Sequence, residues 1–267
     1  MTYRFQLLYS RKEIKQLQNA TVALCGLGGY GAALVDPFAR YEFRELRLAD
    51  PDRYEESNMD RQCLAKFSTI GRLKVDVAAR VIKDITKYTK VVKFPDGILT
   101  GNISPFCRNA QVIVDLCDQL SAKLLLHMAY RQLRIPLIAG GSIRWPSRQG
   151  IRVSIYRYDQ GVRWLETSFR PQKWGITGTA WNAFKRVKEI GDMPWSVLRK
   201  IDLENAALRN RTPLTRYGVR QRVVWNAPGG YDPLKVYALT CGILELLIGV
   251  LINREPAHHR INFESFS

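Results

Sequence analysis

The sequence has no paired cysteine motif. Its five cysteines are odd in number, none is spaced Cys-x-x-Cys, and none is grouped with nearby histidines. A structural zinc site and a disulfide framework are therefore not expected. Cys25 and Cys117 lie inside apolar, strand-like runs, which favours buried small side chains in a reducing compartment.

A secretory signal and a membrane-spanning segment are also missing from the sequence. Residues 1–18 contain no apolar run between a basic start and a small-residue cleavage site. The longest apolar stretch, 236–252, is short for a bilayer helix and contains Glu245, so we expect a buried helix or a subunit contact. We expect a cytoplasmic protein without membrane association.

Acidic residues are scarce relative to basic ones. The chain holds 41 Lys and Arg against 24 Asp and Glu, and residues 144–222 alone hold 17 against 6. All six tryptophans lie between positions 145 and 225. This combination suits an acidic partner, either nucleic acid or an acidic protein. The alternative is a solvated basic face over tryptophans of the core.

Short apolar runs alternate with helical patterns in the first half of the chain. Strands are expected at 21–27, 46–50, 90–94, 112–116 and 136–141, and helices at 29–41, 71–87 and 121–134. This rhythm predicts an α/β fold with a Rossmann-like, doubly wound, mostly parallel sheet. Further strands at 151–158, near 222–227 and at 260–266 predict an antiparallel extension of that sheet. Residues 160–220 are expected to hold insertions and loops.

A glycine-rich loop follows the first expected strand. "GLGGYG" contains Gly26, Gly28, Gly29 and Gly31, and a helical pattern begins directly after it. Glycines permit a tight turn and close backbone approach, so a phosphate can sit at the positive end of the helix. Asp50, at the end of the second strand, is placed to bind a ribose hydroxyl. The pattern indicates a nucleotide but leaves ATP and a nicotinamide cofactor open.

Polar and charged residues further along favour ATP. Asn58, Arg61 and Gln62 follow the second strand, Lys74 lies in "GRLK", and Asp118 follows the fourth strand. Hydride transfer by a nicotinamide cofactor does not require an arginine, a lysine and a further carboxylate near the cofactor's phosphates. In an ATP site, two cations neutralise the triphosphate and the departing pyrophosphate, and a carboxylate holds Mg²⁺. Taken singly, each residue is as well explained by a solvated loop or a helix cap.

These motifs occur in the order of a known family. The sequence resembles the ThiF/MoeB/HesA superfamily of adenylyltransferases, which are related to ubiquitin-activating enzymes, through "GLGGYG", "LADPD", "NMDRQ", "GRLK" and "VDLCD". The resemblance implies that a nucleotide-binding set consists of Gly26, Gly28, Gly29, Gly31, Asp50, Asp52, Asn58 and Gln62. It further implies that Arg61 and Lys74 act on the phosphates, that Asp118 is the magnesium-linked carboxylate, and that Arg4, with Arg11 behind it, reaches into the partner's site of a homodimer.

The resemblance also implies a domain plan and a reaction. Residues 1–267 would form one adenylyltransferase domain, with an ATP-binding half at about 1–156 and a substrate-binding and dimerisation half at about 157–267. A carboxylate would attack the α-phosphate of ATP, which releases pyrophosphate and leaves an acyl adenylate. ATP and Mg²⁺ are the expected cofactors.

Three departures from the family pattern leave the substrate open. Zinc cysteines are absent, no cysteine lies between positions 118 and 240, and Gln119 and Lys123 stand where asparagine and arginine are frequent. Cys63 and Cys241 remain weak candidates for a catalytic thiol. The expected substrate is a small ubiquitin-like or sulfur-carrier protein or peptide with a free C-terminal carboxylate. The alternatives are dehydration of threonylcarbamoyl-adenosine in tRNA by the same chemistry, and a catalytically silent scaffold subunit.

Overall fold

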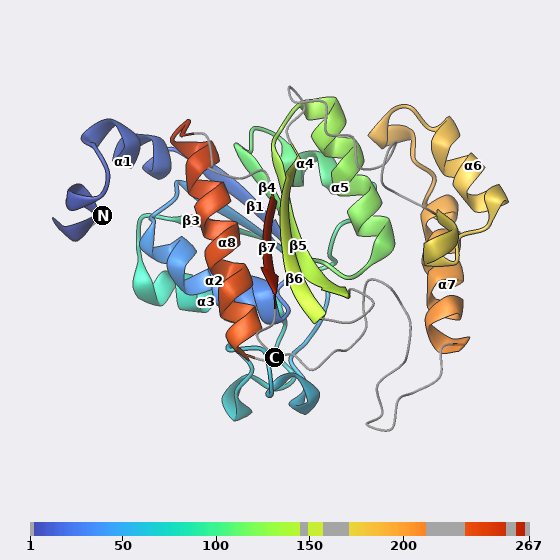
Figure 1. Ribbon diagram of the computed structural model, residues 1–267, viewed down its shortest axis with the longest axis horizontal. Helices are drawn as coiled ribbons and strands as arrows, with labels where there is room; N and C mark the ends of the chain where they lie inside the picture. Colours follow the sequence, from blue (N-terminus) through green and yellow to red (C-terminus); the bar gives the residue numbers. More distant parts are fainter. Residues whose placement is uncertain (1–2, 145–148, 157–170, 212–232, 255–259, 265–267) are drawn as a thin grey trace.

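A seven-stranded sheet forms the centre of the computed structural model, which describes residues 3–144, 149–156, 171–211, 233–254 and 260–264 (Figure 1). The strand order is β3-β2-β1-β4-β5-β6-β7. Five strands run parallel, at Thr21–Cys25 (β1), Glu45–Ala49 (β2), Lys90–Phe94 (β3), Val112–Asp115 (β4) and Leu137–Arg144 (β5). The antiparallel pair is Gln149–Tyr156 (β6) and Arg260–Glu264 (β7).

Helices cover both faces of this sheet, because the parallel strands are apolar on both sides. Val22 and Leu24 of β1 pack into one core, whereas Ala23 and Cys25 pack into the other. The helices over the first core are Arg11–Gln18 (α1), Gly29–Arg40 (α2), Lys74–Ile85 (α3) and Pro233–Leu251 (α8). Those over the second are Ile103–Cys107 (α4), Leu120–Leu133 (α5), Gly178–Arg186 (α6) and Trp195–Arg211 (α7).

Short 3₁₀ segments connect several of these elements. Their bounds are Tyr3–Leu7 (η1), Glu56–Asn58 (η2), Phe67–Thr69 (η3), Pro171–Trp174 (η6) and Ile190–Asp192 (η7). Among the described residues, no helix is both long and apolar enough to cross a bilayer.

The predicted fold class is confirmed, including the parallel sheet and its antiparallel continuation through β6 and β7. The strand expected near 222–227 lies outside the described residues. Within 160–220, where insertions and loops were expected and no helix or strand was assigned from the sequence, the structure has α6 and α7. The division into two functional halves stays a prediction, although β7 of the second half pairs with β6 of the first.

Two glycines of "GLGGYG" are required by packing. Gly26 has a φ of +93°, and a Cβ at this residue would lie 2.5 Å from the carbonyl carbon of Leu116. A Cβ at Gly31, inside α2, would lie 1.8 Å from the carbonyl oxygen of Gly26. The loop is therefore clamped between the turn after β4 and the first turn of α2. By contrast, a Cβ at Gly28 would meet nothing within 4 Å.

Replacing Gly31 by alanine should lower the free energy of unfolding by at least about 3 kcal/mol, because the methyl group cannot fit without moving α2 away from the loop. Gly178→Ala is the matched control, since Gly178 is helical and its Cβ would enter open space. Urea denaturation measures both variants. Equal midpoints for the two would show that α2 does not press on the loop.

Candidate active site

A cavity of about 410 Å³ opens where the chain leaves β1 and β4 in opposite directions. After β1 the chain crosses to β2 on one side, and after β4 it crosses to β5 on the other, so the loops beyond these neighbouring strands diverge. The cavity brings together most of the predicted residues, namely Gly26, Gly28, Gly29, Asp50, Asp52, Asn58, Arg61, Gln62, Lys74 and Asp118. Residues more than ninety positions apart thus share one wall.

The glycine loop presents backbone donors to this cavity. Gly28 is the residue before the first turn of α2 and makes no side-chain cap, and Gly29 begins the helix. The first N–H groups of a helix have no partner within it, and they carry its partial positive charge. This end of the cavity is therefore suited to an anion. Gly31, predicted to bind nucleotide, is not among the lining residues, and its observed contact is with Gly26.

Asp50 holds the loops on either side of the cavity. Its carboxylate accepts hydrogen bonds from the N–H of Leu27 at 2.6 Å and from the N–H of Asp52 at 2.9 Å. Burial raises the pKa of Asp50 above its usual value, although Lys74 acts in the opposite direction. Two backbone hydrogen bonds therefore fix the position of this side chain.

Lys74 is a buried cation at the start of α3. Its ammonium lies 2.8 Å from a carboxylate oxygen of Asp52, and its side chain is only 6% exposed whereas that of Asp52 is 61% exposed. The backbone N–H of Lys74 donates to the carbonyl of Asp52 at 3.0 Å, and that of Tyr54 donates to the carbonyl of Arg72 at 3.0 Å, which fixes the start of the helix. The charge of Lys74 is thus directed into the cavity by the fold.

The "ESNMDRQ" segment forms a compact turn over the cavity. Arg61 donates to the carbonyl of Ser57 at 2.6 Å and to the carboxylate of Asp60 at 2.7 Å. Asn58 is buried and accepts a hydrogen bond from the N–H of Glu55. Gln62 is also buried, and its side-chain oxygen has no partner among the described residues. A buried amide group without a partner is costly in a fold, and here it borders a cavity.

Asp118 is exposed and lies on the turn between β4 and α5. The turn is held by Asp115, whose carboxylate accepts hydrogen bonds from the N–H of Cys117 at 3.2 Å and from the ammonium of Lys123 at 3.0 Å. Burial by itself would lower the pKa of Lys123, but Asp115 together with the neighbouring Cys117 and Cys25 raises this pKa above its usual value. A buried ion pair therefore supports the turn that presents Asp118.

The remaining predicted residues are not brought to the cavity by the described atoms. The backbone of Arg4 belongs to η1, but its side chain lies outside the described part of the structure. Arg11 is exposed at the start of α1. Cys63 and Cys241 are exposed, and neither lines the cavity.

Several cavity residues were missed by the sequence reasoning. Cys25 and Cys117 were expected only as buried small side chains, yet both line the cavity. A hydrogen bond with Cys25 and burial raise the pKa of the Cys117 thiol well above its usual value, so it is not an activated nucleophile. Gln119 also lines the cavity. The sequence had marked Gln119 as a departure from the family pattern, and its position directly after Asp118 was a second signal.

The ThiF family matches residues 2–158, which is more than half of the chain. The chain belongs to the ThiF family.

Curated relatives of this ThiF family chain match about half of its length. Adenylyltransferase and sulfurtransferase MOCS3 of Drosophila virilis is 25% identical over 143 residues, which are 54% of this chain and 31% of the relative. The tRNA threonylcarbamoyladenosine dehydratase of Haemophilus influenzae is 30% identical over 135 residues, which are 50% of this chain and 52% of the relative. The matches thus cover less than two thirds of these relatives.

Solved structures share the ThiF family fold over a longer stretch. MccB of E. coli with MccA-N7isoASN superposes with a TM-score of 0.63 at 15% identity, covering 95% of this chain and 64% of that one. The E. coli tRNA N6-threonylcarbamoyladenosine dehydratase, TcdA, in complex with AMP gives a TM-score of 0.58 at 17% identity, covering 93% and 92%. At these identities the likeness establishes the fold.

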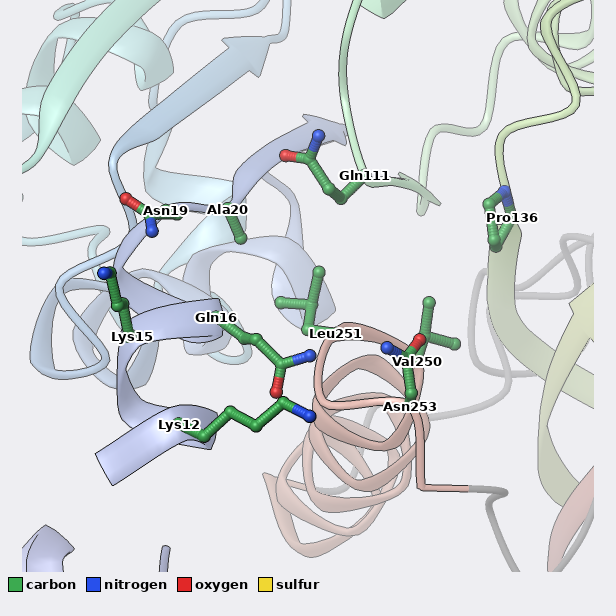
Figure 2. Close-up of a pocket in the computed structure, with 10 residues that line it drawn as sticks. All are labelled: Lys12, Lys15, Gln16, Asn19, Ala20, Gln111, Pro136, Val250, Leu251 and Asn253. Atoms are coloured by element: carbon green, nitrogen blue, oxygen red, sulfur yellow. The ribbon is translucent and has the colours of Figure 1, made fainter. Parts of the chain in front are cut away.

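A second cavity, of about 740 Å³, lies between α1 and the end of α8 (Figure 2). Figure 2 shows Gln16 of α1 extending toward Leu251 of α8, with Gln111 and Pro136 on the sheet side. These last two residues precede β4 and β5, so this cavity lies at the amino ends of the strands. It shares no lining residue with the first cavity and contains none of the predicted site residues.

The buried Asp115–Lys123 pair should matter far more for stability than an exposed pair. Lys123→Met leaves the Asp115 carboxylate without its cation in a site where Asp115 is 1% exposed, which should cost about 3 to 5 kcal/mol of unfolding free energy. Lys90→Met removes the exposed partner of Glu45 and should cost less than about 1 kcal/mol. Urea denaturation of both variants measures the difference. Similar small losses would show that the Asp115 carboxylate is reached by water.

Proposed function

We propose that this ThiF family protein is an ATP-dependent adenylyltransferase. It activates a carboxylate as an acyl adenylate and releases pyrophosphate. The substrate is the C-terminus of a small ubiquitin-like or sulfur-carrier protein or peptide. One observation carries the proposal: the glycine loop, Arg61, Lys74 and Asp118 line the same cavity although they come from four separate segments.

The reaction needs charge neutralisation and alignment. A carboxylate oxygen of the substrate attacks the α-phosphorus of ATP, and the bond from that phosphorus to the bridging oxygen of pyrophosphate breaks. No side chain has to gain or lose a proton in this half of the reaction. Lys74 and Arg61 supply positive charge where negative charge accumulates, and one such preorganised contact contributes on the order of 3 kcal/mol to the transition state.

The other cavity residues fit the remaining parts of the nucleotide. Backbone N–H groups at Gly28 and Gly29 suit the phosphates, and the buried carboxylate of Asp50 suits the ribose hydroxyls. The unpartnered side-chain oxygen of Gln62 is available to a ligand donor. Asn58 supports the turn that carries Arg61.

Asp118 fits a magnesium ion that is held mainly by the nucleotide. Its carboxylate is exposed in the same cavity as the two cations, and Mg²⁺ prefers one or two carboxylates together with phosphate oxygens. When bound, Mg²⁺ would supply positive charge to the leaving pyrophosphate. Asp52 is a second carboxylate in the cavity, and its pairing with Lys74 holds that cation in place. We further propose a homodimer in which Arg4 enters the partner's site.

A tRNA substrate is the second candidate. The relative from Haemophilus influenzae is named for a tRNA reaction, and the segment from 144 to 222 is strongly basic, which favours phosphate binding. The chemistry at the cavity would be the same. The third hypothesis is a catalytically silent scaffold subunit. It requires that the cavity does not bind ATP.

A pyrophosphate-exchange assay tests these three hypotheses about function. We expect ATP with Mg²⁺ to support exchange only when a ubiquitin-like sulfur-carrier protein is present, and we expect no saturable binding of NADH. Asp118→Ala should reduce exchange at least about 100-fold without changing the unfolding midpoint, because a transition-state contact is lost. Asp84→Ala, which removes an exposed carboxylate from α3, is the control.

Each alternative has its own outcome in this experiment. Exchange with purified tRNA and none with the carrier would replace the protein substrate by tRNA. If the native protein does not bind ATP, the scaffold hypothesis would replace the enzymatic one. Near-normal exchange by the Asp118→Ala variant would contradict the magnesium role of this residue.

A further inference from the structure

The outward side of α7 carries large apolar side chains next to cations. Trp195 is 44% exposed and Leu203 is 61% exposed, and Arg199 lies between them at the same four-residue spacing. Residues spaced by four lie along one side of a helix. Lys200 is exposed beside this row. We call Trp195, Arg199, Lys200 and Leu203 the α7 face.

The acidic residues of α7 are directed away from the α7 face and are already paired. Asp202 accepts hydrogen bonds from the side-chain amide of Gln119 at 3.1 Å and from the N–H of Ser121 at 3.0 Å. Glu204 accepts two from Thr177, one from the N–H and one from the hydroxyl, both at 2.8 Å. Within the part of α7 whose side chains are described, the outward side is therefore apolar and positive.

Asp202 connects α7 to the wall of the nucleotide cavity. Helix α5 begins directly after Gln119, and the side chain of Gln119 makes no cap of its own. The first turn of α5 is capped instead by the carboxylate of Asp202, which lies in α7, 81 residues after Ser121. Gln119 lines the cavity and adjoins Asp118. In Figure 1, α7 lies beside α5 at the edge of the molecule, away from α8.

We propose that the α7 face docks the body of the small carrier protein whose C-terminus enters the cavity, an inference that rests on the proposed function. The complementary surface is an apolar patch flanked by carboxylates, which would cover Trp195 and Leu203 and pair with Arg199 or Lys200. Tryptophan and arginine are the residue types that most often dominate the binding energy of a protein interface.

The side chains of the α7 face favour a protein over tRNA. An RNA contact would use the two cations and stacking on Trp195. Leu203, the more exposed of the two large apolar residues, offers neither a charge nor a hydrogen bond nor a ring to stack on. Its burial is favourable only against an apolar surface.

Two other tryptophans, Trp174 and Trp181, lie in the basic segment that was expected to suit an acidic partner. Trp181 is half-buried, stacks on Phe184 with ring centroids 5.1 Å apart, and packs against the core. The side chain of Trp174 lies outside the described part of the structure. Within the described residues, Trp195 is the tryptophan that is exposed.

Direct binding of a fluorescently labelled ubiquitin-like sulfur-carrier protein tests the proposal without requiring catalysis. Trp195→Ala and Arg199→Glu should each weaken carrier binding at least about 10-fold, the effect of losing one interface contact of about 1.4 kcal/mol. The ATP affinity of each variant should stay within about twofold of that of the native protein. The unfolding midpoint should not change measurably. Lys83→Glu, an exposed charge reversal on α3, should leave carrier binding unchanged.

The outcomes separate this proposal from the proposed function. Carrier-dependent exchange with unaltered carrier binding in both variants would overturn the α7 face and leave the adenylyltransferase intact. Carrier binding that the variants weaken, without any exchange, would support the α7 face and remove the enzymatic function. Loss of tRNA affinity in place of carrier affinity, or conversion of a dimer to a monomer by Trp195→Ala, would assign the face to RNA or to a second copy and overturn the proposal.

Discussion

The close contact between the glycine loop and the turn after β4 is the constraint on which the site depends. The backbone N–H of Gly26 donates to the carbonyl of Ala49, and that of Leu116 donates to the carbonyl of Cys25, both at 2.8 Å. The first bond ties the glycine loop to the end of β2, and the second ties the turn after β4 to the end of β1, where the chain diverges. The start of α2 and the carboxylate of Asp118 can then face one cavity, since each follows one of these turns. A side chain at Gly26 would separate them.

Much of the parallel sheet was predictable because its signals are local. Buried strands read as apolar runs, and the glycine loop and the order of the charged motifs placed the cavity at the ends of β1 and β4. The missed features depend on distant partners. Helix α7 is held partly by Asp202 and Glu204, whose partners lie in other elements, and the sequence alone does not reveal such pairs. The ion pair of Asp115 and Lys123 is local, but it depends on how the chain turns from β4 into α5, which the sequence pattern does not specify.

The cations of the cavity are held by acceptors of the protein itself. Lys74 is paired with Asp52, and Arg61 is paired with Asp60 and a backbone carbonyl. These contacts keep both side chains in ordered positions while limiting the cost of burying positive charge. In the proposed reaction the phosphates would meet charges that are already oriented, which is the condition for strong electrostatic stabilisation of a transition state.

The capping of α5 by Asp202 also restricts how this protein can be recombined with its relatives. The helices α6 and α7 pack on one face of the sheet, together with α4 and α5, so this segment could in principle be exchanged for that of a relative. A chimaera that imported a different segment would nevertheless have to bring a carboxylate to the same place. Without it, the first turn of α5 would begin uncapped immediately beside the residue proposed to hold the metal.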